Sequence, residues 1–288
     1  MDILITGVLL GATYSLIAMG LTLQYGVARV MNLANGEMLV AGAFGAFWVF
    51  TAQNVSPYAA AAFVVPAAFL LNWLIYRFLM RPLVRRAKSR GMLEVDTILA
   101  TFGLSFVFVG LMVLAFGGGF FTYSYLAEPY RIFGSPFGLN RLAASAAAVL
   151  ICGGLYWAIH GTRPGMAIRA VAVDPTAAGL VAIDVPRVSA FAFALGGAVT
   201  AAGGIVLSTF LTMDASIGVV FTMKALIIVI MGGVGDVRGA IIASLILGLA
   251  ETAVASLVDP GLTLAAAYLL FVLVLLFRPE GLFGRRQS

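Results

Sequence analysis

Apolar residues gather along the chain into nine long stretches, with short polar segments between them. The stretches cover residues 3–24, 38–50, 57–79, 95–116, 142–159, 188–211, 224–234, 240–257 and 262–277. A helix needs about 20 apolar residues to span a bilayer core of about 30 Å, and several stretches approach or exceed that length. The pattern therefore predicts an all-α, polytopic membrane protein. Because 224–234 is too short to cross alone at about 1.5 Å per residue, we expect eight or nine transmembrane helices, with broken or re-entrant segments.

Two of the polar segments break apolar sequence with glycine, amide and charged residues. The first break spans 24–37, and the second spans 230–240 with four glycines, one Asp and one Arg. Lipid cannot satisfy freed backbone N–H and C=O groups, so each break must be buried in protein or line a wet cavity. Paired broken helices at membrane depth are where transporters place their pathway. The two breaks are therefore the candidate transport region.

Six polar residues in or near these breaks are candidates for the substrate pathway, because polar side chains are costly toward lipid. They are Asn32, Asn35, Glu37, Asp236, Arg238 and Glu251. For Asp236 and Arg238 the pattern favours a local structural pair over substrate binding. For Glu251 it favours an interhelical hydrogen bond over a proton relay. Repeats of small residues, with Gly7, Gly11 and Ser15 among them, predict close helix packing.

Composition agrees with a membrane chain and excludes several kinds of chemistry. Charged residues make up 10% of the sequence and the mean hydropathy is +1.08, whereas soluble domains are about 25% charged. We therefore expect a single transmembrane domain over residues 1–288. With one Cys and one His, no disulfide framework and no Cys or His metal site is expected. No P-loop, H-E-x-x-H or G-x-S-x-G motif occurs, so we expect no catalytic residues, cofactor or metal, and a membrane enzyme is disfavoured.

Basic residues predict the orientation, because Lys and Arg accumulate in short cytoplasmic loops. An arrangement with the N-terminus outside and the C-terminus inside puts 14 of the 17 Lys and Arg on the cytoplasmic side. The exceptions are Arg131, Arg141 and Lys224. The first stretch has no basic residues before it and is too long for a signal-peptide core, so we expect a retained helix. The positive charge is assigned to these loops and not to nucleic-acid binding.

Two of the connecting segments are candidate docking surfaces. The aromatic segment 120–140 is expected outside, either as an interfacial belt or as a surface for an external partner. In the loop 161–187, Asp174 followed by Pro175 predicts the start of a short helix over 176–182. Such a helix between two spans suits docking onto a soluble partner, although an ordinary surface helix would have the same pattern.

Longer motifs resemble those of branched-chain amino acid ABC transporter permeases of the H type. The motifs are Gly20-Leu-Thr-Leu-Gln-Tyr-Gly-Val-Ala-Arg-Val-Met-Asn-Leu-Ala-Asn-Gly-Glu37, Arg163-Pro-Gly-Met-Ala-Ile-Arg-Ala170, Gly232-Gly-Val-Gly-Asp-Val-Arg-Gly239, Gly248-Leu-Ala-Glu251 and Leu276-Phe-Arg-Pro-Glu-Gly-Leu282. The resemblance covers nearly the whole chain. It departs from the family at Asn35, where His is common, and at Ala182, where Gly is common and where the helix is expected to end.

The resemblance implies one membrane subunit of an importer in a bacterial inner membrane. A second permease, expected to be a paralogue, two cytoplasmic ATPases and a periplasmic binding protein would complete the complex. The implied ATPase-coupling residues are Arg163, Arg169, Asp174, Ala177, Ala178, Ile183 and Asp184. The implied substrate is a branched-chain or related small amino acid, although similar permeases carry urea, short amides or aromatic acids. The other hypothesis is a stand-alone secondary transporter or channel, for which the sparse acidic residues supply no convincing coupling site.

Overall fold

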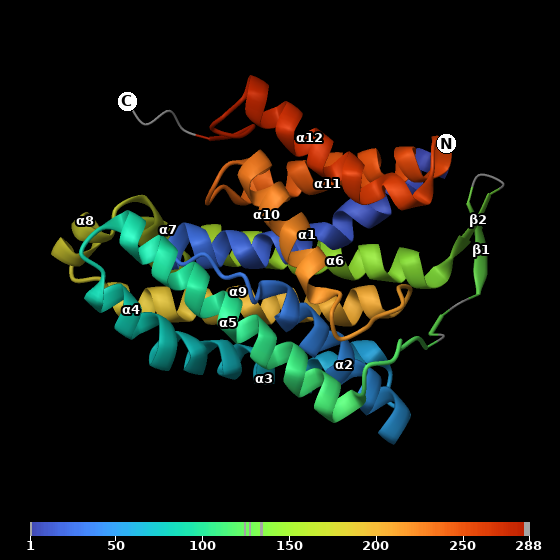
Figure 1. The fold of residues 1–288 in the computed structure, drawn as a ribbon, viewed down its shortest axis with the longest axis horizontal. Coiled ribbons are helices and arrows are strands. Elements are labelled where there is room, and N and C mark those ends of the chain that lie inside the picture. The colour runs from blue at the N-terminus through green and yellow to red at the C-terminus, as the bar shows by residue number, and fades with distance from the viewer. Residues whose placement is uncertain (1, 124, 127, 133–134, 285–288) are drawn as a thin grey trace.

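The computed structural model describes residues 2–123, 125–126, 128–132 and 135–284, and Arg285 and Arg286 lie outside this part of the chain. Figure 1 shows a bundle of long helices. The helices that contain the nine apolar stretches are α1 (Asp2–Ala28), α2 (Asn35–Gln53), α3 (Pro57–Ile75), α5 (Arg90–Phe116), α6 (Leu139–Gly161), α9 (Val185–Ser208), α10 (Gly218–Gly232), α11 (Val237–Leu257) and α12 (Thr263–Phe277). The shorter elements are the π-helical turn η1 (Tyr76–Met80), α4 (Arg81–Arg86), α7 (Arg163–Val173), α8 (Pro175–Leu180), the 3-10 turn η2 (Pro260–Leu262), β1 (Pro129–Ile132) and β2 (Ser135–Gly138).

Seven helical segments among the described residues are long and apolar enough to cross a membrane. They include the continuous run Pro57–Arg86, which joins α3, η1 and α4. The helical, multi-pass character predicted from the sequence is thus confirmed. Two of the helices that contain the apolar stretches fall outside this set: α2 begins with the polar residues Asn35 and Glu37, and α10 has 15 residues, which makes it about 22 Å long.

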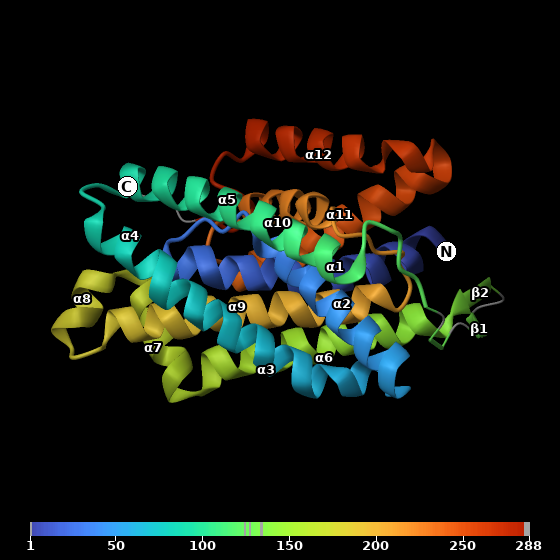
Figure 2. The ribbon, with the colours of Figure 1, turned by 60° about the horizontal axis from the view of Figure 1, so that its bottom comes forward.

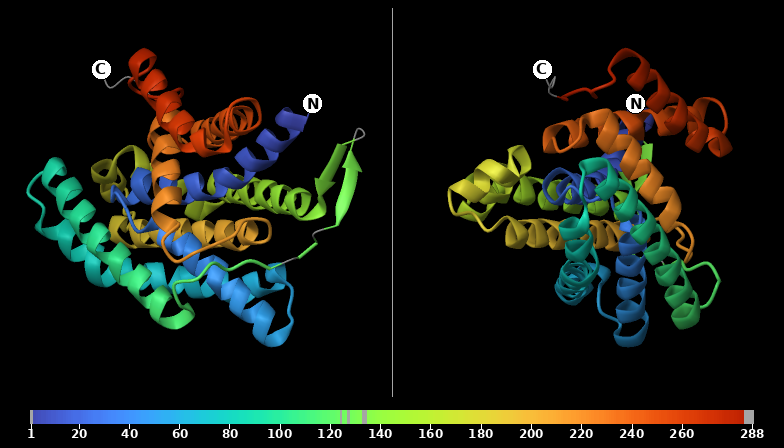
Figure 3. Two further views of the ribbon diagram at one scale, coloured as in Figure 1. Left: turned by 45° about the vertical axis from the view of Figure 1, so that its right-hand side comes forward. Right: turned by 60° about the vertical axis from the view of Figure 1, so that its left-hand side comes forward.

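Helices α1 and α9 form the centre of the bundle. In their most apolar windows 61% and 89% of residues are buried, against 11% in the segment that contains α3 and 6% in the one that contains α12. Figure 3 shows α3 and α5 on the opposite side of these central helices from α12. The outer helices therefore present apolar faces outward, as expected of helices that face lipid or another membrane subunit.

Small residues allow the central helices to touch, as the repeats predicted. A Cβ at Gly20 of α1 would overlap Thr200 and the carbonyl of Gly196 on α9. A Cβ at Gly11 would likewise overlap the backbone of α11 at Leu245. Close backbone approach of this kind is the usual use of small-residue stripes in membrane helices.

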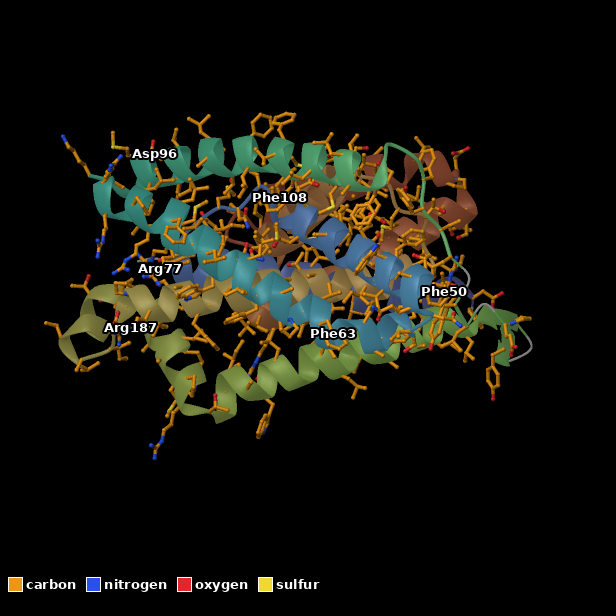
Figure 4. All side chains as sticks on the ribbon, turned by 90° about the horizontal axis from the view of Figure 1, so that it is seen from below. Phe50, Phe63, Arg77, Asp96, Phe108 and Arg187 are labelled. Atoms are coloured by element: carbon orange, nitrogen blue, oxygen red, sulfur yellow. The ribbon has the colours of Figure 1, made fainter. Side chains whose placement is uncertain are left out.

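The bundle has two distinct ends. The start of α1 and the β1–β2 hairpin lie at one end, and α4, α7 and α8 lie at the other (Figures 1 and 2). Seen from below, Arg77, Asp96 and Arg187 lie toward the α8 end and Phe50 toward the hairpin end (Figure 4). The basic loop after α3 and the loop before α9 are therefore at the same end of the molecule.

The segment between α5 and α6 contains two short strands that the all-α prediction missed. β1 and β2 pair antiparallel, with Tyr130 opposite Phe137. Earlier in the segment, the ring of Tyr123 stacks on Phe50 at 5.1 Å, and its hydroxyl lies 2.8 Å from Ser208 Oγ. Burial raises the pKa of Tyr123 to about 12. The aromatic segment is thus anchored onto α2 and α9.

Candidate transport and coupling sites

The first break is a non-helical connection between α1 and α2 whose backbone N–H groups donate hydrogen bonds to side chains of neighbouring helices. Thr101 on α5 accepts a hydrogen bond from the Leu33 N–H at 3.0 Å, and the Gly36 N–H donates to Thr222 Oγ1 on α10 at 2.8 Å. These hydroxyls replace the backbone partners that a continuous helix would supply. The expectation that the break is buried in protein is confirmed, since neighbouring helices supply the polar atoms that lipid lacks.

The two predicted asparagines are buried inside this network. Asn32 donates to Gln24 Oε1 at 2.9 Å, and Thr200 Oγ1 donates to Asn35 Oδ1 at 3.0 Å. Both asparagines are nearly inaccessible to solvent. Their visible role in this conformation is to connect α1, α2 and α9.

Glu37 lies one helical position beyond this network and contacts the start of α10. Its side chain is fully buried, and a Cβ at Gly218 would overlap its carboxylate. Neither carboxylate oxygen has a hydrogen-bond partner in the described part of the chain. Glu37 therefore places a polar group between α2 and α10 that no other side chain satisfies here.

The second break is a glycine turn between α10 and α11. Gly233 and Gly235 have φ values of +103° and +82°, a region that favours glycine. Asp236 caps α11, since its Oδ1 accepts the Gly239 N–H at 2.8 Å. Arg238 instead donates to the hydroxyl of Tyr156 on α6, at 2.6 Å from Nη2. The prediction that Asp236 and Arg238 pair with each other is wrong, because each side chain has another partner.

Residues after α12 supply hydrogen-bond partners to the second break, a contact that was not predicted from the sequence. The Leu282 N–H donates to the Met231 carbonyl at 2.8 Å, and the Phe283 N–H donates to the Gly232 carbonyl at 3.1 Å. Gly281 allows the approach with φ +83°. The Arg-Pro-Glu-Gly-Leu motif thus satisfies the last carbonyls of α10, which a helix end leaves without partners.

Glu251 belongs to a buried triad that joins three helices. Lys224 Nζ on α10 lies 2.8 Å from Glu251 Oε2 on α11. The hydroxyl of Tyr14 on α1 donates to the same oxygen at 2.8 Å and accepts from Lys224 at 2.8 Å. The expected interhelical hydrogen bond of Glu251 is confirmed. Lys224, which was predicted on the non-cytoplasmic side, lies in the second turn of α10 with its side chain 12% exposed.

The predicted short helix of the coupling loop is present as α8. Asp174 caps it by accepting the N–H groups of Thr176 at 2.8 Å and Ala177 at 3.2 Å. The preceding helix α7 was not predicted, although Thr162 and Pro164 are a capping signal for it: the Gly165 N–H donates to Thr162 Oγ1 at 3.2 Å. The loop is therefore two consecutive capped helices.

The remaining predicted coupling residues fix the geometry of this loop. Ala178 is buried, and its carbonyl accepts the Ile183 N–H at 3.2 Å. Asp184 caps α9 by accepting the Arg187 N–H at 3.1 Å, and its other oxygen pairs with Arg187 Nε at 2.8 Å. Arg163 and Arg169 are exposed on α7. These residues shape and surround α8 rather than forming one cluster.

The surface beside these residues is apolar although it lies at a charged end of the molecule. Val173, Leu180 and Val181 are 72%, 86% and 71% exposed. Large apolar side chains this exposed, at the ends of two consecutive short helices, are candidates for an interaction surface. We call these three residues the α8 apolar patch.

Comparison with known proteins agrees with this architecture. A family model described as "Branched-chain amino acid transport system / permease component" matches residues 3–277. The high-affinity branched-chain amino acid transport system permease protein LivH of Salmonella typhimurium is 30% identical over 98% of this chain and 94% of its own length. BraD of Pseudomonas aeruginosa, named for the same transport system, is 28% identical over 99% of this chain and 95% of its own length.

A solved structure, PsaBC from Streptococcus pneumoniae in complex with Fab, aligns with a TM-score of 0.48 at 11% identity, over 98% of this chain and 94% of that one. This likeness is too weak to add to the sequence matches. The family model covers nearly all of the chain, and the Salmonella relative is matched along almost its full length. On these matches the chain belongs to the family of permease components of branched-chain amino acid transport systems.

Proposed function

We propose that this chain is the membrane-spanning permease subunit of an ATP-binding cassette importer in a bacterial inner membrane. It carries branched-chain or related small amino acids, and separate ATPase subunits supply the energy. Family membership and the names of the relatives support the substrate class. The observation that carries the mechanism is the α8 apolar patch, because a short capped helix with exposed apolar residues between two long helices suits contact with a soluble partner.

The proposed orientation puts this patch in the cytoplasm, with the N-terminus and the β1–β2 hairpin outside. It is supported by the basic residues of the loop after α3, which lie at the same end as α8 (Figure 1). Nine crossings fit this orientation if α2 and α10 also cross. The remaining partners are a second permease, a second ATPase and an external binding protein, and the apolar outer faces of α3 and α5 are suitable for the second permease.

Coupling then works through a rigid connection. Movement of an ATPase against α8 is transmitted to α9, because Asp184 caps α9 directly after the loop and the Ala178 carbonyl holds Ile183. Since α9 packs backbone to backbone on α1 at Gly20, its displacement moves the first break. The pathway candidates Asn32, Asn35 and Glu37 lie along this route.

A matched pair of double variants tests the docking surface. Leu180→Ser with Val181→Ser removes most of the α8 apolar patch. Leu257→Ser with Val258→Ser changes a similarly exposed pair, 74% and 69%, at the opposite end of the molecule. Tagged chains are purified in mild detergent from cells that also produce the ATPases, and mass spectrometry quantifies what co-purifies.

The first double variant should lose the ATPases and ATP-driven amino acid uptake, while the second keeps both. Undiminished ATPase binding by the first variant would remove α8 from the interface. If the wild-type chain purifies alone and moves solute in liposomes without ATP, it is a secondary transporter or channel. Uptake of urea, short amides or aromatic acids in place of amino acids would change the substrate but leave the importer intact.

A further inference from the structure

A cavity of about 220 Å³ lies beside the Tyr14–Lys224–Glu251 triad. Its lining is mostly apolar, with Leu9, Phe210 and Leu211 among the side chains, and its polar side chains are those of Thr6, Arg141, Glu251, Thr252 and Thr263. These residues come from the beginnings of α1, α6 and α12, the end of α11 and the segment after α9. The cavity therefore lies toward the hairpin end of the bundle, opposite α8 (Figure 1).

Two polar atoms of this lining are buried without a hydrogen-bond partner among the described residues. They are Glu251 Oε1 and Thr252 Oγ1. The other Glu251 oxygen already accepts from Tyr14 and Lys224, which fixes the orientation of the carboxylate. Leaving buried acceptors unsatisfied costs free energy, so unpartnered atoms on two consecutive residues of the cavity lining indicate a donor that binds there.

We propose that this cavity is a binding site for a small aliphatic amino acid in its zwitterionic form, a proposal that rests on the function proposed above. The α-ammonium group donates to Glu251 Oε1 and Thr252 Oγ1. The α-carboxylate accepts from the guanidinium of Arg141, and the aliphatic side chain contacts Leu9, Phe210 and Leu211. Each charge of the ligand thus meets an opposite charge, and its apolar part meets apolar walls.

The size and chemistry of the cavity select this class among the candidate solutes. At about 220 Å³ it is smaller than the roughly 300–1,000 Å³ of sites for drug-sized ligands, so it suits one small molecule. Urea and short amides carry no carboxylate for Arg141. Aromatic acids without an amine carry no cation for Glu251. Only a small molecule with both charges and an aliphatic group uses the whole lining.

The place of the cavity defines its role in import. In the proposed orientation it lies toward the outer face, where a binding protein delivers solute. Glu251 joins it to Lys224 on α10, the helix that ends at the second break. A ligand ammonium on Oε1 places a second cation beside Lys224, which holds Oε2, and the repulsion between the two cations loosens the contact between α10 and α11. The cavity is thus an entry site connected to the broken helices.

Binding of radiolabelled leucine to the full chain in lipid nanodiscs tests the site, with two analogues as competitors. 3-Methylbutylamine keeps the amine and the aliphatic group without the carboxylate, and 4-methylpentanoate keeps the carboxylate without the amine. The variants are Arg141→Met and the nearly isosteric Thr252→Val. The control is Thr51→Val, which changes an exposed threonine of α2 away from the cavity. Gel filtration and thermal unfolding confirm that each variant is folded.

We expect saturable leucine binding that Arg141→Met weakens by about tenfold or more and Thr252→Val by about threefold to tenfold, with Thr51→Val unchanged, as for loss of hydrogen bonds to charged groups. Neither analogue should compete at concentrations where unlabelled leucine does. Absence of binding to the wild-type chain, or equal binding by all three folded variants, would overturn the site. ATP-driven leucine uptake by the complete transporter is measured in parallel, so that an intact importer with an empty cavity is distinguished from failure of the importer itself.

Discussion

Gly26, near the end of α1, packs against Gly235 in the turn between α10 and α11. A Cβ at Gly26 would lie 2.8 Å from the α-carbon of Gly235. The two broken segments of the chain, more than 200 positions apart in sequence, therefore touch backbone to backbone. Because α1 and α10 also share the Tyr14–Lys224 contact, the helices next to the two breaks are joined at two places.

Substituting Gly26 with Ala should destabilise the protein by about 1–3 kcal/mol, because the new methyl group has no space at this contact. The matched control is Gly103→Ala on α5, where a Cβ would meet no atom within 4 Å. That control should be neutral or stabilising by up to about 1 kcal/mol, since alanine favours helix. Thermal unfolding in detergent measures both. Equal melting temperatures for the two variants would mean that the Gly26–Gly235 contact is not tight in solution.

The positions of the helices along the chain could be predicted from the sequence, because local patterns determine them. Apolar length located each long helix, and the Asp174-Pro175 pair located the start of α8 because capping is a local interaction. The contact between Gly26 and Gly235 could not be predicted, since it depends on how distant helices pack. The β1–β2 hairpin was missed because apolar periodicity in an aromatic, proline-containing segment is too weak to indicate strands.

Loss of either charge of the buried Lys224–Glu251 pair should strongly destabilise the folded protein. Lys224→Met leaves the Glu251 carboxylate in a buried site without its cation, and the expected cost is about 3–5 kcal/mol. The double variant Lys224→Met with Glu251→Leu should recover much of this loss, because it removes both charges. Thermal unfolding of the single and double variants measures these changes in stability. A double variant as unstable as the sum of two single variants would show that the pair does not interact energetically.

The residues around Glu251 could be predicted only in part from the sequence, because most of its contacts join distant helices. Glu251 could be singled out because an acid in an apolar stretch is conspicuous. Its partners could not, since Lys224 and Tyr14 are 27 and 237 positions away in sequence. Arg238 was conspicuous too, but its partner Tyr156 lies on another helix, and so proximity in sequence to Asp236 was misleading.

Removing the cap of α8 should weaken coupling more than folding. Asp174→Ala leaves the N–H groups of Thr176 and Ala177 without their acceptor, at a cost of about 0.5–2 kcal/mol to this short helix. Amide hydrogen exchange in α8 should accelerate, and ATP hydrolysis by the assembled complex should proceed with less uptake per ATP. The control is Asp259→Ala, which removes a similar cap at η2 near the opposite end. If both variants transport with the same efficiency per ATP, the order of α8 does not contribute to coupling.

The end of α8 provides the most discriminating test, because the same chemical change should have opposite effects five residues apart. Ala182 adopts φ +62°, a left-handed conformation that costs a residue with a Cβ about 1–2 kcal/mol. Ala182→Gly should therefore stabilise the α8–α9 connection by up to about 1 kcal/mol after the added freedom of glycine in the unfolded chain is subtracted. Ala177→Gly, inside the exposed face of α8, should destabilise it by about 1 kcal/mol.

Hydrogen exchange of the amides in α8 and at Ile183 measures both, with slower exchange expected for the first variant and faster exchange for the second. Slower exchange is expected because Ile183 donates to the Ala178 carbonyl just beyond the left-handed residue. Faster exchange in both variants would mean that Ala182 leaves the left-handed conformation in solution, and that α8 ends in another way.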